Sequence, residues 1–283
     1  MKLMPSALAV PPDLAAKRKQ PMNSSKTSSK QSSKTASSAG SGIRLNRWLA
    51  SCGLGSRRKM ESLITSGRIA VNGQICQDLG IRIGKEDEVT LDGKPLQPAA
   101  QPMYLILNKP RGYMVTRTDE KQRQTVYDLL PPEAAHLNYA GRLDKNSEGL
   151  LLFTNDGELI NQLTHPSFSI EKVYKVDVKP PLPYSAIRSL REGVVIEGGP
   201  TRSAGVYIKS RSEKGMSLKL VIREGRKRQI RQMIEAVGGK VIALRRLQFG
   251  TLTLKDLQPG CWRPLTPTEV RALRKLCKGK PKR

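Results

Sequence analysis

Asp144 lies in a polar segment, residues 141–147, that ends just before an apolar run at residues 150–153. A continuous apolar run predicts a strand that is buried on both faces. The carboxylate would then sit in a loop anchored to the rigid centre of the fold, which is the support that a reacting acid needs. The structural alternative is that Asp144 caps a turn and that Arg142 is its local salt-bridge partner.

Tyr174 occupies a second segment that could contribute to the same site. Residues 172–178 have strand character, and alternation places Tyr174, Val176 and Val178 on one face. A tyrosine in such a position is more often a core residue than a catalytic one. It could also place an aromatic ring with a polar tip into a cleft.

A third segment, residues 224–234, is rich in arginine. Apolar residues at helical spacing predict a helix here that ends at Gly238 and Gly239. Arg228 and Arg231 are three residues apart, so they are predicted to emerge on neighbouring turns of one face. Because a guanidinium can pair bidentately with a carboxylate or a phosphate, this cluster predicts anion binding rather than a merely solvated face.

The charge of the whole chain indicates the kind of partner. Its 283 residues hold 50 Lys and Arg against 24 Asp and Glu, a formal net charge of +26. Such an excess does not suit an enzyme of small neutral substrates. It favours nucleic acid, because each phosphate that is neutralised releases condensed counterions. With 37% hydrophobic residues the chain can also bury a substantial core.

Several classes of site are not predicted. The four cysteines (Cys52, Cys76, Cys261 and Cys277) show no metal-binding spacing and are expected to be reduced, buried thiols. The sequence has no P-loop or dinucleotide fingerprint and no apolar stretch long enough to span a membrane. We therefore expect no metal, no cofactor and no membrane partner.

Composition divides the chain into four parts. Residues 1–41 form a Ser- and Lys-rich arm that is predicted to be disordered. A compact module follows at residues 42–98, then a larger region of mixed strands and helices at 103–276 and a basic tail at 277–283. Pro95, Pro98 and Pro102 mark the predicted linker. The arm lacks the apolar core of a signal peptide, so we expect a cytoplasmic protein, with an organellar transit peptide as the minor alternative.

The small module combines a predicted helix pair with short strands. Ser56 is the expected N-cap of the second helix, which ends at Gly67, and strands at 68–71 and 88–91 end in the turns Asn72-Gly73 and Asp92-Gly93. Positive charge gathers near one end of the helix pair, where helix N-terminal amides would add to it. Five arginines are the candidate nucleic-acid contacts: Arg44, Arg47, Arg57, Arg58 and Arg68. A solvated charged face is the alternative.

Residues 44–49, 53–58 and 64–73 resemble the small RNA-binding domain first described in ribosomal protein S-four. The larger region resembles the pseudouridine synthases of the RsuA/RluB/RluF family. The family's motifs are matched by residues 108–112, by 141–144 with 149–151, by 171–174 and by 224–233. This resemblance implies an α+β fold with a mixed, largely antiparallel sheet and an RNA cleft across it. It also implies isomerisation of uridine to pseudouridine without metal or cofactor.

By matching position, the resemblance makes Asp144 the catalytic carboxylate and Arg231 its partner, whose charge would keep the acid ionised. Tyr174 would stack on the target base and assist removal of the proton from its carbon 5. Arg142 would fill the space that the flipped uridine leaves. The RNA backbone would be held by Lys109, Arg111, Arg226 and Arg228.

The resemblance leaves the substrate only partly defined. The segments at 191–200 and 165–167 are closer to the RluB branch, which acts on large-subunit ribosomal RNA, and the small-subunit branch is the runner-up. The expected partner is ribosomal RNA or a ribosomal subunit precursor, and the expected state is a monomer. A non-catalytic RNA-binding protein of ribosome assembly is the alternative. It would explain the charge, but not why Asp144, Tyr174 and Arg231 all fall on motif positions.

Overall fold

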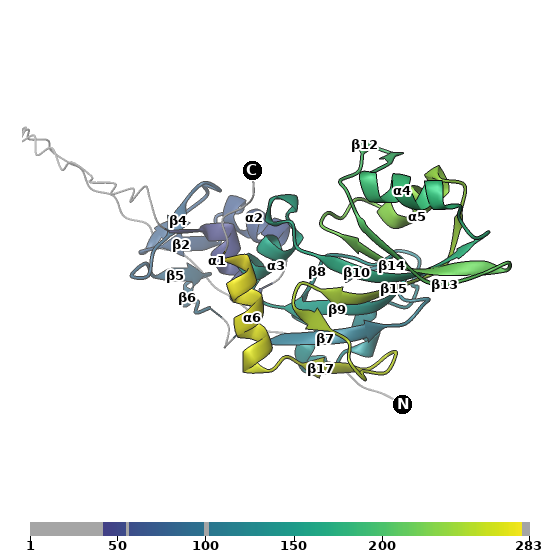
Figure 1. Ribbon diagram of the computed structural model, residues 1–283. Coiled ribbons are helices and arrows are strands. Elements are labelled where there is room, and N and C mark those ends of the chain that lie inside the picture. The colour runs from purple at the N-terminus through teal and green to yellow at the C-terminus, as the bar shows by residue number, and fades with distance from the viewer. Residues whose placement is uncertain (1–41, 55–56, 99–101, 279–283) are drawn as a thin grey trace, which may run out of the picture. The chain divides into compact units, whose positions relative to one another are not determined.

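The computed structural model describes residues 42–54, 57–98 and 102–278 (Figure 1). The predicted arm, the N-cap at Ser56 and the last five residues of the tail lie outside these ranges. In the part that is described, no helix is long and apolar enough to cross a membrane.

The N-terminal region contains two helices and two small sheets. The helices are α1 (Leu45–Ser51) and α2 (Arg57–Thr65). A four-stranded sheet has the order β3 (Gln74–Ile75), β2 (Ile69–Val71), β5 (Val89–Leu91), β6 (Lys94–Pro95), and β1 (Ile43–Arg44) pairs with β4 (Arg82–Ile83). Because Pro95 belongs to β6, the prediction that the linker begins at that proline is wrong.

The turns and the core of this region follow directly from the sequence. Asn72 and Gly73 both have positive φ angles, 51° and 78°, as the two central residues of a tight hairpin turn require. Apolar residues from both helices and three of the strands are buried together: Leu45, Leu49, Met60, Ile64, Ile69, Cys76, Ile83 and Val89. The helices and strands therefore share one small core.

The larger region is organised around one nine-stranded sheet. Seven strands follow the order β13 (Gly205–Ser212), β14 (Gly215–Ile222), β10 (Lys172–Lys179), β15 (Lys240–Phe249), β9 (Glu148–Thr154), β7 (Tyr104–Lys109), β17 (Trp262–Pro264). Two short strands lie off this path, β8 (Asn138–Ala140) beside β9 and β16 (Leu252–Thr253) beside β15. All pairs are antiparallel except β9 with β15, which confirms the expected mixed, largely antiparallel sheet.

Helices and short turns complete the region. The α-helices are α3 (Gly157–Thr164), α4 (Tyr184–Glu192), α5 (Gln229–Ala236) and α6 (Pro267–Cys277). The 3-10 helices are η1 (Val126–Leu129), η2 (Pro132–Ala134) and η3 (Pro166–Phe168). A separate small hairpin joins β11 (Val195–Ile196) to β12 (Gly199–Pro200).

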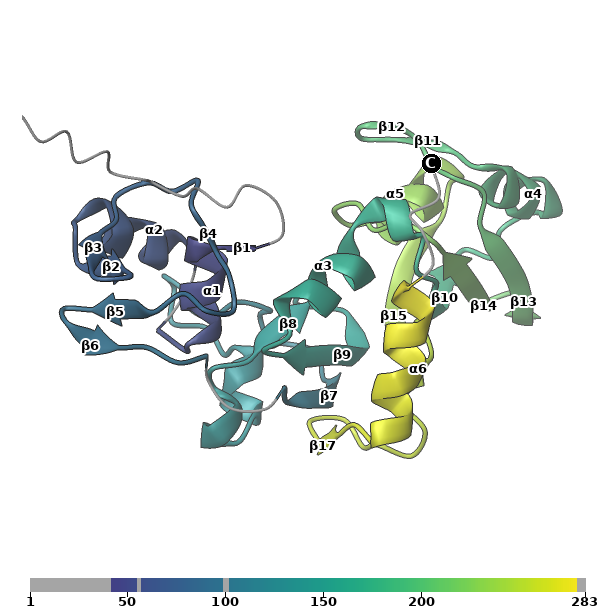
Figure 2. The same ribbon diagram turned by 90° about the vertical axis from the view of Figure 1, so that its left-hand side faces the viewer.

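Both faces of the central strands are buried, as the apolar run at residues 150–153 predicts. Leu151 and Phe153 pack in one core with α4 and α5, whereas Leu150 and Leu152 pack in a second core with α3 and α6. Figure 1 shows α4 and α5 together on one side of the sheet, and Figure 2 shows α6 apart from them. Because side chains alternate between the two faces of β9, this one strand contributes residues to two cores.

The parallel contact between β9 and β15 depends on Gly149, the Cα partner of Arg246. Gly149 has a φ of +109°, and a Cβ atom there would lie 2.2 Å from the carbonyl oxygen of Arg246. A side chain at this position is excluded both by the backbone conformation and by the neighbouring strand. The glycine thus lets two antiparallel groups of strands join into one sheet.

The four cysteines are free, but they are not all buried. Cys76 and Cys277 are buried, Cys52 is half-buried and Cys261 is exposed. The expectation of buried thiols is therefore wrong for Cys261, which lies in the turn before β17, where no core residue is required. Burial raises the pKa of Cys52 and of Cys277 to about 11, so neither thiol is a reactive nucleophile at neutral pH.

Candidate active site

Asp144 lies in the loop between β8 and β9. Lys109 donates hydrogen bonds to backbone carbonyl groups of this loop. The ammonium group of Lys109 donates to the carbonyl oxygens of Pro110, Lys145 and Ser147 at 3.0, 3.2 and 2.9 Å. Burial lowers the pKa of Lys109 to about 8. The loop that carries the acid is thus fixed to the end of β7 on both sides of Asn146.

The prediction that Lys109 holds the RNA backbone is wrong. Its side chain is 0% exposed, so no phosphate can reach it. The motif that contains Lys109 was identified from the sequence. Lys109 is, however, the last residue of β7, a strand whose residues are all buried. Its function in the fold is to orient the loop that holds Asp144.

We predict that Lys109→Met lowers the free energy of unfolding by about 3 kcal/mol, because three carbonyl groups lose their donor in a buried place. The rate of the isomerisation that the resemblance implies should fall, whereas the affinity for RNA should stay unchanged. Urea unfolding and filter binding measure the two effects, with the exposed Lys214→Met as the matched control. Weakened RNA binding in a fully folded variant would contradict this assignment.

Arg231 contacts Asp144 from α5, as the motif positions predict. The Nε of Arg231 lies 3.6 Å from Oδ2 of Asp144, which is an ion pair rather than a hydrogen bond. Its Nη2 donates to the carbonyl oxygen of Asn146 and to the hydroxyl of Ser147, both at 3.3 Å. The guanidinium therefore holds the loop as well as the acid.

The exposure of the pair shows which member a substrate can reach. The side chain of Arg231 is 15% exposed and that of Asp144 is 34% exposed. Burial lowers the pKa of Arg231, and the charge of Asp144 opposes that effect. An arginine remains protonated nonetheless. The permanently charged Arg231 is thus largely covered, whereas Asp144 beside it is accessible to a substrate.

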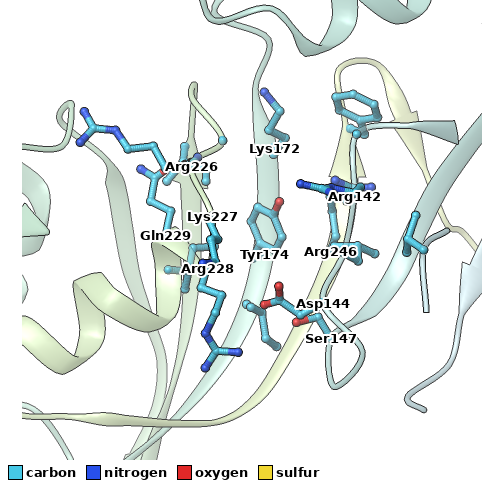
Figure 3. Close-up of a pocket in the computed structure, with 18 of the residues that line it drawn as sticks. Arg142, Asp144, Ser147, Lys172, Tyr174, Arg226, Lys227, Arg228, Gln229 and Arg246 are labelled. Atoms are coloured by element: carbon cyan, nitrogen blue, oxygen red, sulfur yellow. Dashed lines mark hydrogen bonds between the residues drawn. The ribbon is translucent and has the colours of Figure 1, made fainter. Parts of the chain in front are cut away.

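Tyr174 shares a cavity with Asp144. It lies on the inner face of β10, is 7% exposed and packs with the core beneath α4 and α5. Figure 3 shows its ring above the carboxylate of Asp144, with Lys227 and Arg228 on the opposite wall. The cavity measures about 570 Å³, and its walls come from the Asp144 loop, β10, β15 and the segment before α5.

The segment before α5 differs from its predicted form. The helix begins at Gln229, and Arg228 is its N-cap residue in the left-handed conformation, with a φ of 51°. The prediction that Arg228 and Arg231 share a helix face is therefore wrong, because the turn before the helix directs Arg228 elsewhere. Arg228 is exposed and lines the cavity, whereas Arg231 supports Asp144 from outside the lining.

Arg226 lines the cavity, but its donors are largely occupied. Its guanidinium donates to the carbonyl oxygens of Gly199 and Pro200 at 2.8 and 2.6 Å, and it forms an ion pair with Glu224. Glu224 in turn accepts from Gln229 at 2.7 Å. Arg226 therefore ties the β11–β12 hairpin to the wall of the cavity, an arrangement that its spacing in the sequence does not reveal.

The other predicted RNA contacts lie at the surface. Arg142 is exposed and lines the cavity. Arg111 is exposed but pairs with Glu148 and with the carbonyl oxygen of Ile242. The five arginines of the N-terminal region are all exposed, and one of them, Arg68, pairs with Asp92. Their proposed roles in RNA binding stay predictions.

Two buried basic residues of the cavity were missed by sequence reasoning. Lys172 precedes Tyr174 by two residues in the same motif, so strand alternation could have placed it on the same face. Arg246 stands next to Arg245 in β15, and no spacing signal marks it. Both line the cavity and both are buried. Among the described residues, no cluster of metal-ligating side chains occurs.

Comparison with known proteins defines the family. Residues 103–236 match the family described as RNA pseudouridylate synthase, and residues 43–98 match the S4 domain. The chain is 39% identical over 235 residues to ribosomal large subunit pseudouridine synthase B of Bacillus subtilis, an alignment that covers 82% of this chain and 96% of the relative. The chain belongs to the RNA pseudouridine synthase family.

Further comparisons agree with this assignment. The synthase is 38% identical over 247 residues to ribosomal large subunit pseudouridine synthase B of Vibrio cholerae, covering 85% of this chain and 77% of the relative. A crystal structure of a pseudouridylate synthase matches its fold with a TM-score of 0.60 at 30% identity, covering 82% of this chain and 99% of that one. The expected family and the expected α+β fold are confirmed.

Proposed function

We propose that this synthase converts a uridine of large-subunit ribosomal RNA to pseudouridine, with Asp144 as the catalytic carboxylate. The observation that carries the proposal is the cavity in which Asp144, paired at 3.6 Å with the half-buried Arg231, lies beside the ring of Tyr174. The names of the relatives from Bacillus subtilis and Vibrio cholerae support the large ribosomal subunit as the source of the RNA.

The reaction moves the base without changing its composition. The bond between C1′ of the ribose and N1 of uracil breaks, the base rotates, and a new bond joins C1′ to C5. A proton leaves C5, and N1 gains one. Asp144 can attack C1′ or remove the 2′ proton, and on either route the bonding electrons of the broken bond pass to the base. Its ion pair with Arg231 places a positive charge beside the carboxylate that either route uses.

The cavity also suits a nucleotide that has left its helix. A uridine must unstack to reach an acid inside a cavity, and a flat aromatic wall offers a surface on which the base can stack again. Tyr174 supplies that wall, and the exposed Arg142 and Arg228 stand at the rim. The exposed arginines of the S4 domain would add backbone contacts elsewhere on the same RNA.

The test uses RNA that carries tritium on carbon 5 of its uridines. Joining C1′ to C5 displaces that tritium into water, so we expect release from large-subunit transcripts on incubation with the full chain. Release from small-subunit transcripts alone would move the substrate to the other subunit. No release from either RNA would contradict the proposed function. Pseudouridine mapping of rRNA with and without the protein would then identify the position.

We also propose that the synthase acts as a cytoplasmic monomer. One copy of the chain supplies Asp144, Tyr174 and Arg231 to the same site, which supports a monomer. The four free cysteines fit a reducing compartment. Light scattering of the purified chain tests the oligomeric state, and localisation of a tagged copy in the native host tests the compartment.

A further inference from the structure

Two basic side chains flank Tyr174 on its own face of the sheet, and the mechanism above does not use them. Lys172 lies two residues before Tyr174 on β10, and Arg246 is the Cα partner of Tyr174 on β15. All three line the same cavity. Figure 3 shows Lys172 beyond the hydroxyl end of the tyrosine ring and Arg246 at its side. A base stacked on Tyr174 would therefore meet a cation at two of its edges.

The two cations are deeply buried and retain donors for a ligand. Lys172 is 8% exposed and donates to the carbonyl oxygen of Ile170 at 2.9 Å. Arg246 is 3% exposed, and its Nε donates to the carbonyl oxygen of Leu150 at 2.7 Å. Among the described residues, the buried Nη2 of Arg246 has no hydrogen-bond partner. Each charged group is thus held in place by one hydrogen bond, and Nη2 of Arg246 is left without a partner.

This arrangement costs free energy in the empty site. Buried charges are normally paired, yet neither cation forms an ion pair within 4.0 Å among the described residues. Burial and the charge of Arg246 lower the pKa of Lys172 to about 8, whereas the carboxylate of Glu224 acts in the opposite direction. The ring of Phe249 lies 5.7 Å from Lys172 and 5.0 Å from Arg246, which compensates only in part. A negative charge that arrives in this place would relieve the cost.

The proposed reaction supplies such a charge. When the bond from C1′ to N1 breaks, its electron pair leaves with the base, so the detached uracil is an anion whose charge spreads over N1 and the two carbonyl oxygens. We propose that Lys172 and Arg246 bind the carbonyl oxygens of the uracil stacked on Tyr174 and stabilise this anion while the base rotates. The charge on the base disappears when C5 bonds to C1′. C5 then releases its proton, and N1 takes one up, so the product base is neutral. Donors that are already fixed and dehydrated stabilise a developing charge most effectively.

The inference rests on the proposed function and is tested with Lys172→Met in the full chain. Single-turnover tritium release at saturating RNA should slow by about 100-fold or more. The Kd for the RNA and the slope of log Kd against log salt should stay unchanged, because no phosphate contact is lost. Lys172→Arg should restore most of the rate. Lys175→Met is the matched control, since Lys175 is exposed on the opposite face of β10.

The competing outcomes are distinct. A weaker Kd with a salt slope reduced by about one would identify Lys172 as a phosphate contact and overturn the proposal. An unchanged rate in a folded variant would show a structural role and overturn it too. If the wild-type chain is inactive on every rRNA, the proposed function fails and the inference fails with it. An active wild-type chain with an unaffected Lys172→Met overturns the inference alone.

A pH profile gives a second readout that does not need the methionine variant. The protonated form of Lys172 binds the anion, so the wild-type single-turnover rate should fall as pH rises through about 8, where the lysine loses its proton. The charged groups that act on it are Arg246 and Glu224. The pKa of Lys109 is also lowered to about 8, so Lys172→Arg should still lose some of its rate through that range, but less than the wild-type chain loses. The same fall in Lys172→Arg would overturn the proposal.

Discussion

Replacing Asp144 with asparagine is expected to reduce tritium release from labelled ribosomal RNA by at least about four orders of magnitude. Asparagine keeps the size of the side chain, but its amide can neither attack C1′ nor accept the 2′ proton. It also cannot form the ion pair with Arg231. RNA affinity should stay within about twofold, because the phosphate contacts are made elsewhere.

The control for this prediction is Asp177→Asn, which changes a half-buried carboxylate on the opposite face of β10 from Tyr174. It should retain wild-type activity. Asp144→Asn must also show a normal thermal unfolding midpoint, so that lost activity is not lost structure. Retained turnover in a folded Asp144→Asn chain would remove this residue from the catalytic role.

Gly149→Ala is expected to lower the free energy of unfolding by more than about 4 kcal/mol. The added Cβ would lie 2.2 Å from one backbone atom of Arg246 and 2.7 Å from another, so β9 and β15 would have to separate. The φ of +109° adds strain that any side chain would suffer. Denaturant unfolding of the purified chain measures the effect.

Gly198→Ala isolates the contribution of backbone strain. Gly198 has a φ of +86°, but none of the neighbouring atoms that the structure describes lies within 4 Å of the position of its added Cβ. Gly198→Ala should lower the free energy of unfolding by roughly 1–2 kcal/mol, the cost of a left-handed residue alone. Equal destabilisation by both substitutions would show that the close approach of the two strands does not matter.

The sequence predicted those parts of the fold whose signals are local. The apolar run at residues 150–153, the alternation through Tyr174 and the turn at Asn72 and Gly73 all correspond to the observed elements. The prediction at the start of α5 was wrong because periodicity does not report the left-handed residue at Arg228. Helix ends depend on a single backbone conformation, which apolar spacing does not encode.

The site was predicted less completely than the fold. The motifs predicted that Asp144, Tyr174 and Arg231 belong to one site, and the structure places Asp144 and Tyr174 in one cavity with Arg231 paired to the acid. The motifs alone could not show whether a lysine side chain is buried or exposed. Lys109 was assigned to RNA because it is basic, yet a strand with both faces covered carries it into the core. Arg246 was not predicted as a site residue, because it is placed beside Tyr174 only by the pairing of β10 with β15. Such a contact exists only after long-range folding.

The parallel joint between β9 and β15 also decides when the enzyme becomes competent. Asp144 precedes β9, whereas Tyr174 and Arg231 belong to the strands and helix on the other side of that joint. Neither antiparallel group alone can assemble the acid, its cation and the aromatic wall. Turnover during renaturation would therefore report the pairing of β9 with β15. No turnover is expected while only one of the two strand groups has formed.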